Sequence, residues 1–132
     1  MKYLLDTDMC IYFLNGDKGV VDKMKQISPD LLNITLLTVS ELFYGAYSSA
    51  NVENNIDKVT KFCQWLNLLE ANMKSANIFG RIKSELRKEG KLIEDFDIAI
   101  ASISLAENLT LVSGNISHFS RIRDLKLQNW SE

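Results

Sequence analysis

The sequence of 132 residues contains one proline, one histidine and two cysteines. With so little proline and 46% hydrophobic residues, the chain has the composition of a globular protein rather than a disordered one. Cys10 and Cys63 are far apart and lack the CxxC spacing of a zinc site. Two cysteines also do not make the framework of a disulfide-rich secreted protein. These counts favour a protein of the reducing cytosol, with Cys10 filling space in the core.

A long apolar run is also absent. The longest stretch, IAIASISLA at residues 98–106, is shorter than the roughly 20 residues needed to cross a bilayer. Asp6 interrupts the apolar start of the chain, so we expect no signal peptide. The sequence therefore predicts a cytoplasmic protein without a membrane partner. Its length predicts a single domain spanning residues 1–132.

The chain has no excess of basic residues, because its net charge is −2. This total argues mildly against a nucleic-acid partner, since nucleic-acid-binding domains are usually basic. The charge is uneven, however, and residues 81–91 and 118–126 are rich in Lys and Arg. Local patches matter more than totals for binding a polyanion. For residues 81–91, a solvated helix face is an equally good explanation.

Short apolar runs alternate with amphipathic segments along the whole chain. Strands are predicted at residues 2–5, 31–37, 109–113 and 125–130, the last at an edge of the sheet. Helices are predicted at residues 9–15, 17–27, 38–49, 52–69, 76–90, 95–108 and 116–122. The segment 66–71 fits either the end of a helix or a strand. The alternation indicates an α/β fold with a parallel sheet covered on both faces.

Acidic residues follow the predicted strands or begin the helices near them. Asp6 follows the first strand, Glu41 lies in the predicted first turn after the second, and Asp97 begins the apolar helix before the third. Because parallel strands end at one edge of a sheet, these side chains are expected to converge there. Clustered carboxylates need a cation to stay ionised, and oxygen ligands select Mg²⁺ or Mn²⁺.

Each acid also has a purely structural explanation. Residues 38–41, TVSE, match a capping box in which Glu41 would bond the backbone of Thr38. Asp6 could cap the helix after the first strand, and Asp95 or Asp97 could cap the apolar helix. Glu94 and Asp95 are the better candidates for caps or helix-dipole partners. Asp97, between Phe96 and Ile98, is expected in a drier pocket and nearer to a metal.

Three segments together resemble the PIN-domain toxins of the VapC type. They are LLDTDMCIYFL from residue 4, TVSELFYGA from residue 38, and GKLIEDFDIAIASISLAENLTLVSGNISHFSRIRDLKLQNW from residue 90. The resemblance covers nearly the whole chain, and its ELFYGA element and closing Val–x–x–Asn–x–x–x–Phe pattern are its specific parts. It implies a PIN-like three-layer α/β/α sandwich around a central, mostly parallel sheet of 4–5 strands.

The resemblance also implies an activity and its residues. Asp6, Glu41 and Asp97 match the family's catalytic acids, with Asp6 and Asp97 holding Mg²⁺ or Mn²⁺. The implied activity is cleavage of RNA by an endoribonuclease, often within structured RNA such as tRNA. The family further implies a toxin–antitoxin pair, a cognate antitoxin that blocks the active-site groove, and a homodimer.

The sequence departs from the family pattern at several positions. Asn115 stands where many PIN domains have a fourth acid, which puts a second metal in doubt, and Ser113 stands where Thr is frequent. Ser113, Asn115 and Arg121 are predicted to contact substrate or to support the acids. Asp8 is interpreted as a supporting or capping residue and not as a ligand. His118 is assigned a structural or RNA-contacting role.

Two alternatives follow from the same residues. The acids could be caps on a non-catalytic PIN scaffold that binds RNA or protein. The DTD at residues 6–8 also resembles the entrance of haloacid-dehalogenase phosphatases, with Asp6 as nucleophile and Asp8 as acid. No GDxxxD-like acidic pair follows, and Cys10 replaces the expected Thr or Val, which argues against the phosphatase.

Overall fold

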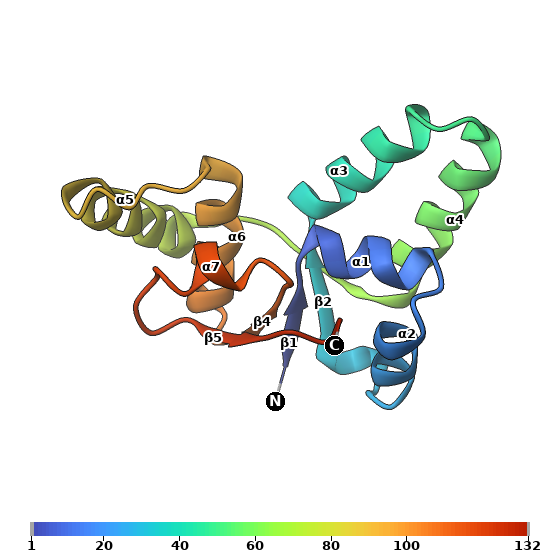
Figure 1. Cartoon of the computed structure of the whole chain (residues 1–132), viewed down its shortest axis with the longest axis horizontal. Coiled ribbons are helices and arrows are strands. Elements are labelled where there is room, and N and C mark those ends of the chain that lie inside the picture. Colours follow the sequence, from blue (N-terminus) through green and yellow to red (C-terminus); the bar gives the residue numbers. More distant parts are fainter. Residues whose placement is uncertain (1, 132) are drawn as a thin grey trace.

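Five short strands pair in parallel in the order β3-β2-β1-β4-β5 in the computed structural model, which describes residues 2–131 (Figure 1). The strands are β1 (Tyr3–Leu5), β2 (Leu32–Thr35), β3 (Asn67–Leu69), β4 (Thr110–Val112) and β5 (Lys126–Gln128). The direction of strand order reverses at β1, which lies between β2 and β4. This arrangement confirms the predicted parallel sheet, with the last strand at an edge.

Seven α-helices and one short 3₁₀ turn connect these strands within the described residues. The helices are α1 (Thr7–Leu14), α2 (Lys18–Lys25), α3 (Leu36–Tyr47), α4 (Val52–Trp65), α5 (Met73–Lys88), α6 (Asp95–Ala106) and α7 (Ile116–Phe119). The 3₁₀ turn, η1 (Pro29–Leu31), precedes β2 and contains the single proline. Figure 1 shows α1 to α4 on one side of the strands and α5 to α7 on the other.

The two faces of the sheet carry separate hydrophobic cores. Successive residues of a strand point to opposite faces, and β1 shows this directly. Leu5 packs in the core that includes α1, α2 and α4, whereas Leu4 packs in the core that includes α5 and α6. Both side chains are fully buried. The predicted three-layer α/β/α sandwich is therefore confirmed.

The start of α3 differs from the prediction. The strand expected at residues 31–37 ends at Thr35, and Leu36 and Leu37 already belong to the helix. Thr35 is the N-cap, because its Oγ1 accepts a hydrogen bond of 3.1 Å from the backbone N–H of Thr38. The predicted capping box at residues 38–41 is therefore wrong. Thr38 is buried at the third helical position, and Glu41 lies deeper in the helix than expected.

Other boundaries follow the local pattern more closely. The ambiguous segment 66–71 contains the edge strand β3. Helix α5 ends before Gly90, whose positive φ of 68° suits a residue without a side chain, and Arg87 and Lys88 lie in its last turn. Between residues 2 and 131, none of the helices is long and apolar enough to pass through a lipid bilayer.

Candidate active site

Strands β1 and β4 end at the point where the strand order reverses. Asp6 follows β1 and Ser113 follows β4, and the two strands are paired neighbours. In parallel α/β sheets, such a reversal forms a crevice at the carboxyl ends of the strands, in which ligands bind. Here Ser113 Oγ donates a hydrogen bond of 2.8 Å to Asp6 Oδ2. Both side chains are buried, so the crevice begins with a carboxylate largely withdrawn from water.

Asp6 is both a helix cap and a perturbed acid. Its Oδ1 accepts a hydrogen bond of 2.8 Å from the backbone N–H of Thr7 at the start of α1. The pKa of Asp6 is raised from 3.8 to about 6, chiefly by burial and then by the charge of Asp8. The charge of Asp97 adds to this rise. The hydrogen bonds from Ser113 and Thr7 lower the pKa and so oppose it. A carboxyl in such surroundings gains from a bound cation, which favours its ionised form.

Asp8 connects the start of α1 to the loop after β4. Its Oδ1 accepts from the backbone N–H of Met9 at 2.8 Å, and its Oδ2 accepts from that of Gly114 at 3.0 Å. A Cβ atom on Gly114 would lie 3.0 Å from Asp8 Oδ2, so a side chain here would press on the carboxylate. Burial raises the pKa of Asp8. Both carboxylate oxygens hold backbone groups, which suits the supporting role predicted for this residue.

Asp97 reaches the same crevice from the first turn of α6. Its side chain is 15% exposed, and burial raises its pKa, while the hydrogen bond and charge of His118 lower it. His118 Nδ1 lies 3.4 Å from Asp97 Oδ2. The charge of Asp97 in turn raises the pKa of both Asp6 and Asp8. The structure thus places Asp97 close enough to Asp6 for its charge to raise the pKa of Asp6.

Glu94 and Asp95, the other two acids near Asp97, have different roles. Glu94 is at the N-cap position of α6, but its side chain makes no capping hydrogen bond. Asp95 is exposed and forms an ion pair of 2.9 Å with Lys83 of α5. The prediction that one of these acids caps α6 with its side chain is therefore wrong. Their placement beside the positive end of the helix dipole, as predicted, is still favourable.

A chain of polar contacts joins Asp6 to Asp97 through residues after β4. The backbone N–H of Asn115 donates to Ser113 Oγ at 2.9 Å, and Asn115 Nδ2 lies 2.9 Å from His118 Nδ1. His118 then contacts Asp97. A structural role was one of the two predicted for His118, but its contacts with Asn115 and Asp97 were not predicted. Its spacing of three residues from Asn115, on a short helix after a strand, was the signal that could have found them.

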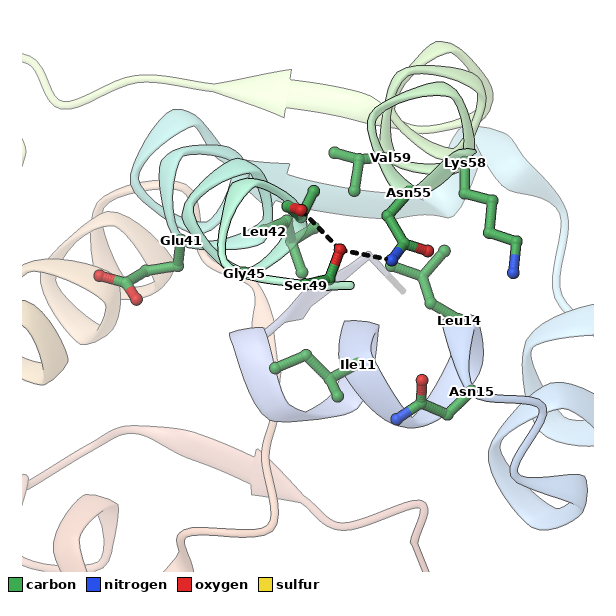
Figure 2. A pocket seen from close by; sticks show the side chains of 11 residues that line it. Ile11, Leu14, Asn15, Glu41, Leu42, Gly45, Ser49, Asn55, Lys58 and Val59 are labelled. Atoms are coloured by element: carbon green, nitrogen blue, oxygen red, sulfur yellow. Dashed lines mark hydrogen bonds between the residues drawn. The ribbon is translucent and has the colours of Figure 1, made fainter. Parts of the chain in front are cut away.

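Glu41 lies apart from this chain of contacts. It is exposed on α3 and lines a groove between α1, α3 and α4. In Figure 2 its side chain extends away from Asn55 and Lys58 of α4. The neighbouring acids that raise the pKa of Asp6 are instead Asp8 and Asp97. Glu41 therefore stays a predicted member of the site.

The donor atoms of the crevice suit a hard divalent cation. Asp6 and Asp97 offer carboxylate oxygens and Asn115 an amide oxygen, which are the ligand types that Mg²⁺ and Mn²⁺ prefer. Burial raises the pKa of both acids, and the charge of Asp97 adds to the rise at Asp6, so a cation would relieve an existing electrostatic cost. In residues 2–131, no three His, Cys, Asp or Glu side chains are already arranged as a metal cluster.

The basic residues of the two Lys- and Arg-rich segments are partly occupied. Arg81 and Arg123 both pair with Glu85, at 2.8 and 2.9 Å. Arg121 Nη1 donates to the backbone carbonyls of Lys91 and Leu92, at 3.3 Å each. Arg121 therefore connects the segment after α7 to the loop that leads into α6 and Asp97. Its predicted contact with substrate stays a prediction.

A mainly apolar groove lies between α1, α3 and α4 (Figure 2). It has a volume of about 310 Å³. Its lining is Ile11, Leu14, Asn15, Glu41, Leu42, Gly45, Ala46, Ser49, Asn55, Lys58 and Val59. Asn55 Nδ2 donates to Ser49 Oγ at 2.8 Å, which fixes one end of the groove. Besides these polar groups and Asn15, the groove has an acid, Glu41, and a base, Lys58, on a mainly apolar wall.

Apolar side chains are also exposed elsewhere on the surface. Phe43 packs against the core, whereas Tyr44 and Tyr47 on α3 are exposed. A second set lies about the β3 edge and the start of α3. It comprises Leu36, Leu37, Leu68 and Met73, and Met73 is 85% exposed. We call these four residues the β3-edge patch.

Comparison with known proteins places this geometry in a family. The chain is 38% identical over 130 residues to ribonuclease VapC2 of Haemophilus influenzae, and the alignment covers 98% of both chains. It is 28% identical to the tRNA(fMet)-specific endonuclease VapC of Shigella flexneri over 99% of both. The crystal structure of VapBC2 from Rickettsia felis bound to a promoter DNA fragment matches with a TM-score of 0.91 at 32% identity, covering 98% of this chain and 99% of that one.

No protein-family model matches the sequence. The full-length relatives are nevertheless decisive, because identity of 38% extends over essentially all of both chains. The acids after β1 and at the start of α6 lie at the crevice where this fold would place a site. The chain belongs to the VapC family of PIN-domain ribonucleases.

Proposed function

We propose that this protein is a Mg²⁺- or Mn²⁺-dependent endoribonuclease, the toxin of a toxin–antitoxin pair, acting on structured RNA such as tRNA in the cytoplasm. The observation that carries the proposal is the convergence of Asp6 and Asp97, each with a raised pKa, at the reversal point of the sheet. The Haemophilus relative is named a ribonuclease, and the Shigella relative an endonuclease specific for tRNA(fMet).

In this mechanism Asp6 and Asp97 would hold the cation. When bound, the cation supplies positive charge for the scissile phosphate and activates the attacking water. Ser113 and Thr7 fix the two oxygens of Asp6, so the carboxylate has one orientation before substrate arrives. The ring of His118 borders the second acid, with Nδ1 3.4 Å from Asp97 Oδ2. Such preorganisation of charge is the main contribution of a protein to phosphodiester cleavage.

Two further residues complete the proposed site. Glu41 would accept a proton from the attacking water or ligate the cation, as the resemblance implied. Asn115 would bond a water through its side-chain amide. Arg81 and Arg123 pair with Glu85 and Lys83 pairs with Asp95, which leaves Lys88 and Lys91 as the better candidates to contact the RNA backbone.

The proposal is tested by incubating the purified protein with tRNA and mRNA, in Mn²⁺ or in EDTA. Cleavage is expected in Mn²⁺, and the Asp97→Asn variant should lose it while remaining folded. Asp95→Asn is the matched control, because Asp95 is in the same helical turn but exposed and paired with Lys83. Its activity should stay within about threefold of the parent.

Other outcomes would contradict the proposal. RNA binding without cleavage in any divalent cation would favour the non-catalytic PIN scaffold. Cleavage that persists in EDTA, or an unchanged rate in Asp97→Asn, would remove the metal site from the mechanism. Release of phosphate from small esters would support the phosphatase, with Asp6 as nucleophile.

We also propose that a cognate antitoxin binds the groove between α1, α3 and α4. The Rickettsia structure is of a VapBC2 complex. The groove here is apolar, carries Glu41 on its wall and so borders the proposed site. A segment of antitoxin lying in it would cover the approach to Glu41. The opposite charges of Glu41 and Lys58 in the groove would fix the orientation of the antitoxin segment.

Two glycines allow a controlled test of this groove. A Cβ atom on Gly45, which lines the groove, or on Gly80 of α5 would meet nothing within 4 Å, so larger side chains fit at both positions. We expect Gly45→Trp to abolish co-purification with a co-expressed antitoxin and Gly80→Trp to leave it intact. Equal loss in both variants, or in neither, would place the antitoxin elsewhere.

A homodimer, implied by the family resemblance, is the assembly that we propose for the toxin itself. The β3-edge patch supports it, because monomeric proteins rarely leave a group of large apolar side chains exposed beside an open edge strand.

A further inference from the structure

His118 Nδ1 is close to two polar atoms that make opposite demands on it. Asn115 Nδ2, a donor, lies 2.9 Å away, and Asp97 Oδ2, an acceptor when ionised, lies 3.4 Å away. A neutral imidazole nitrogen either carries a proton and donates, or lacks one and accepts. The nitrogen can therefore make a good hydrogen bond with only one of these two partners.

The distances favour the bond to Asn115. A separation of 2.9 Å is typical of an N–H donor, whereas 3.4 Å is long even for a neutral pair and longer still for a charged one. In the favoured arrangement Nδ1 is bare and accepts from the Asn115 amide, and Nε2 carries the ring proton. In the alternative, Nδ1–H donates to Asp97 and the Asn115 amide turns its oxygen to the ring.

The choice decides which atom of Asn115 is available to the site. With Nδ2 directed at the ring, Oδ1 points away from it, and among residues 2–131 it makes no hydrogen bond. The backbone of Asn115 is fixed independently, because its N–H donates to Ser113 Oγ, which itself donates to Asp6. The amide oxygen is thus presented from a residue tied to Asp6 through Ser113 and held by the His118 ring, which lies 3.4 Å from Asp97.

We propose that His118 is a positioning residue that holds the amide of Asn115 so that Oδ1, and not the NH₂ group, serves the acidic crevice. Asn115 then offers a neutral oxygen ligand for the cation beside the carboxylates of Asp6 and Asp97. This inference rests on the proposed cation site, and it concerns the hydrogen-bonding role of the ring. Groups that orient ligands in this way typically change metal affinity by about 10- to 100-fold when they are replaced.

The first experiment measures Mn²⁺ affinity by electron paramagnetic resonance and calorimetry, without RNA. His118→Phe removes the acceptor and should weaken binding about tenfold. His118→Gln supplies an acceptor oxygen and should restore affinity to within about threefold of the parent. Unfolding temperatures of all variants show whether each is folded. An unchanged affinity in His118→Phe, or no rescue by Gln, would overturn the proposal.

A double-mutant cycle shows through which residue His118 acts. If it acts through Asn115, then His118→Phe should weaken Mn²⁺ binding in the parent but have no further effect in an Asn115→Leu background. A full additional loss in that background would assign the effect to Asp97 and contradict the inference.

A second measurement stays informative even if the protein binds no Mn²⁺, which would defeat the proposed function. Nitrogen-15 NMR of the histidine ring distinguishes a bare Nδ1 from a protonated one in the neutral side chain. We expect a bare Nδ1, and a shift of its signal in Asn115→Leu as the amide donor is lost. A protonated Nδ1 in the neutral ring, or an unchanged signal, would disprove the arrangement directly.

Discussion

Ser113 Oγ donates a 2.8 Å hydrogen bond to Asp6 Oδ2, although the two residues are 107 positions apart. The bond joins the carboxyl ends of β4 and β1, which are neighbours only because the chain crosses to the other face of the sheet between them. It is the contact that fixes the first acid of the proposed site.

Removal of this hydroxyl should be costly. Ser113→Ala leaves a buried carboxylate with one partner fewer, and we expect a loss of about 1–3 kcal/mol in the free energy of unfolding at pH 7.5. Urea denaturation measures the loss. Ser117→Ala, an exposed serine in the following helix, is the control and should change stability by less than about 0.5 kcal/mol. Equal effects would mean that the Asp6–Ser113 bond contributes nothing specific.

Asp6→Asn should stabilise the protein at neutral pH in the absence of divalent cations. Because the folded state raises the pKa of Asp6 from 3.8 to about 6, it binds the proton more tightly than the unfolded chain. The cost of ionising Asp6 is therefore full above about pH 6 and disappears as the pH falls toward 3.8. At pH 7.5 it is on the order of 3 kcal/mol.

The check is thermal unfolding in EDTA across this pH range. The unfolding temperature of Asp6→Asn should exceed that of the parent at pH 7.5, and the difference should shrink as the pH approaches 4. Asp22→Asn, at an exposed position on α2, should show no such trend. A variant that melts well below the parent at every pH would mean that Asp6 acts mainly as a cap.

Divalent cations should stabilise the parent protein. A cation that binds the folded state alone raises stability by about 2.7 kcal/mol at 100 times its dissociation constant. We expect Mn²⁺ to raise the unfolding temperature of the parent and of Asp95→Asn, but not that of Asp97→Asn. A uniform increase in all three proteins would indicate binding elsewhere on the surface.

Gly114→Ala should disturb Asp8 without touching the proposed ligands. The new Cβ atom would lie 3.0 Å from Asp8 Oδ2, and either the carboxylate or the loop must shift. We expect lower stability and a weaker response to Mn²⁺, measured by thermal unfolding. Gly80→Ala, at a glycine with open space around it, should be neutral or slightly stabilising. If Gly114→Ala behaved like Gly80→Ala, the Asp8–Gly114 contact would be dispensable.

The β3-edge patch should govern assembly. Light scattering is expected to give twice the chain mass of 15.0 kDa for the parent protein. A Leu37→Glu, Met73→Glu double variant should give the monomer, because charge on this patch opposes burial. Leu92→Glu, at another exposed leucine, should leave the dimer intact. A parent that is monomeric at micromolar concentration would refute the homodimer.

Much of the fold could be predicted because its signals are local. The apolar run before Asp6, the periodicity that begins at residue 52 and Gly90 after a basic turn each identify an element from its own residues. The start of α3 could not be predicted in this way. Thr35 and Thr38 are both good capping residues, and only the folded chain shows that Thr35 Oγ1 accepts from the backbone N–H of Thr38 and so begins the helix.

The sequence by itself determined the α/β class and the presence of acids at the ends of predicted strands, because hydrophobic periodicity and strand-end position are properties of neighbouring residues. Only the tertiary structure decided which groups meet there. It paired Ser113 with Asp6, brought His118 to Asp97 and left Glu41 on the wall of a groove. Such contacts depend on strand order, crossover side and helix start, which no short stretch of sequence specifies.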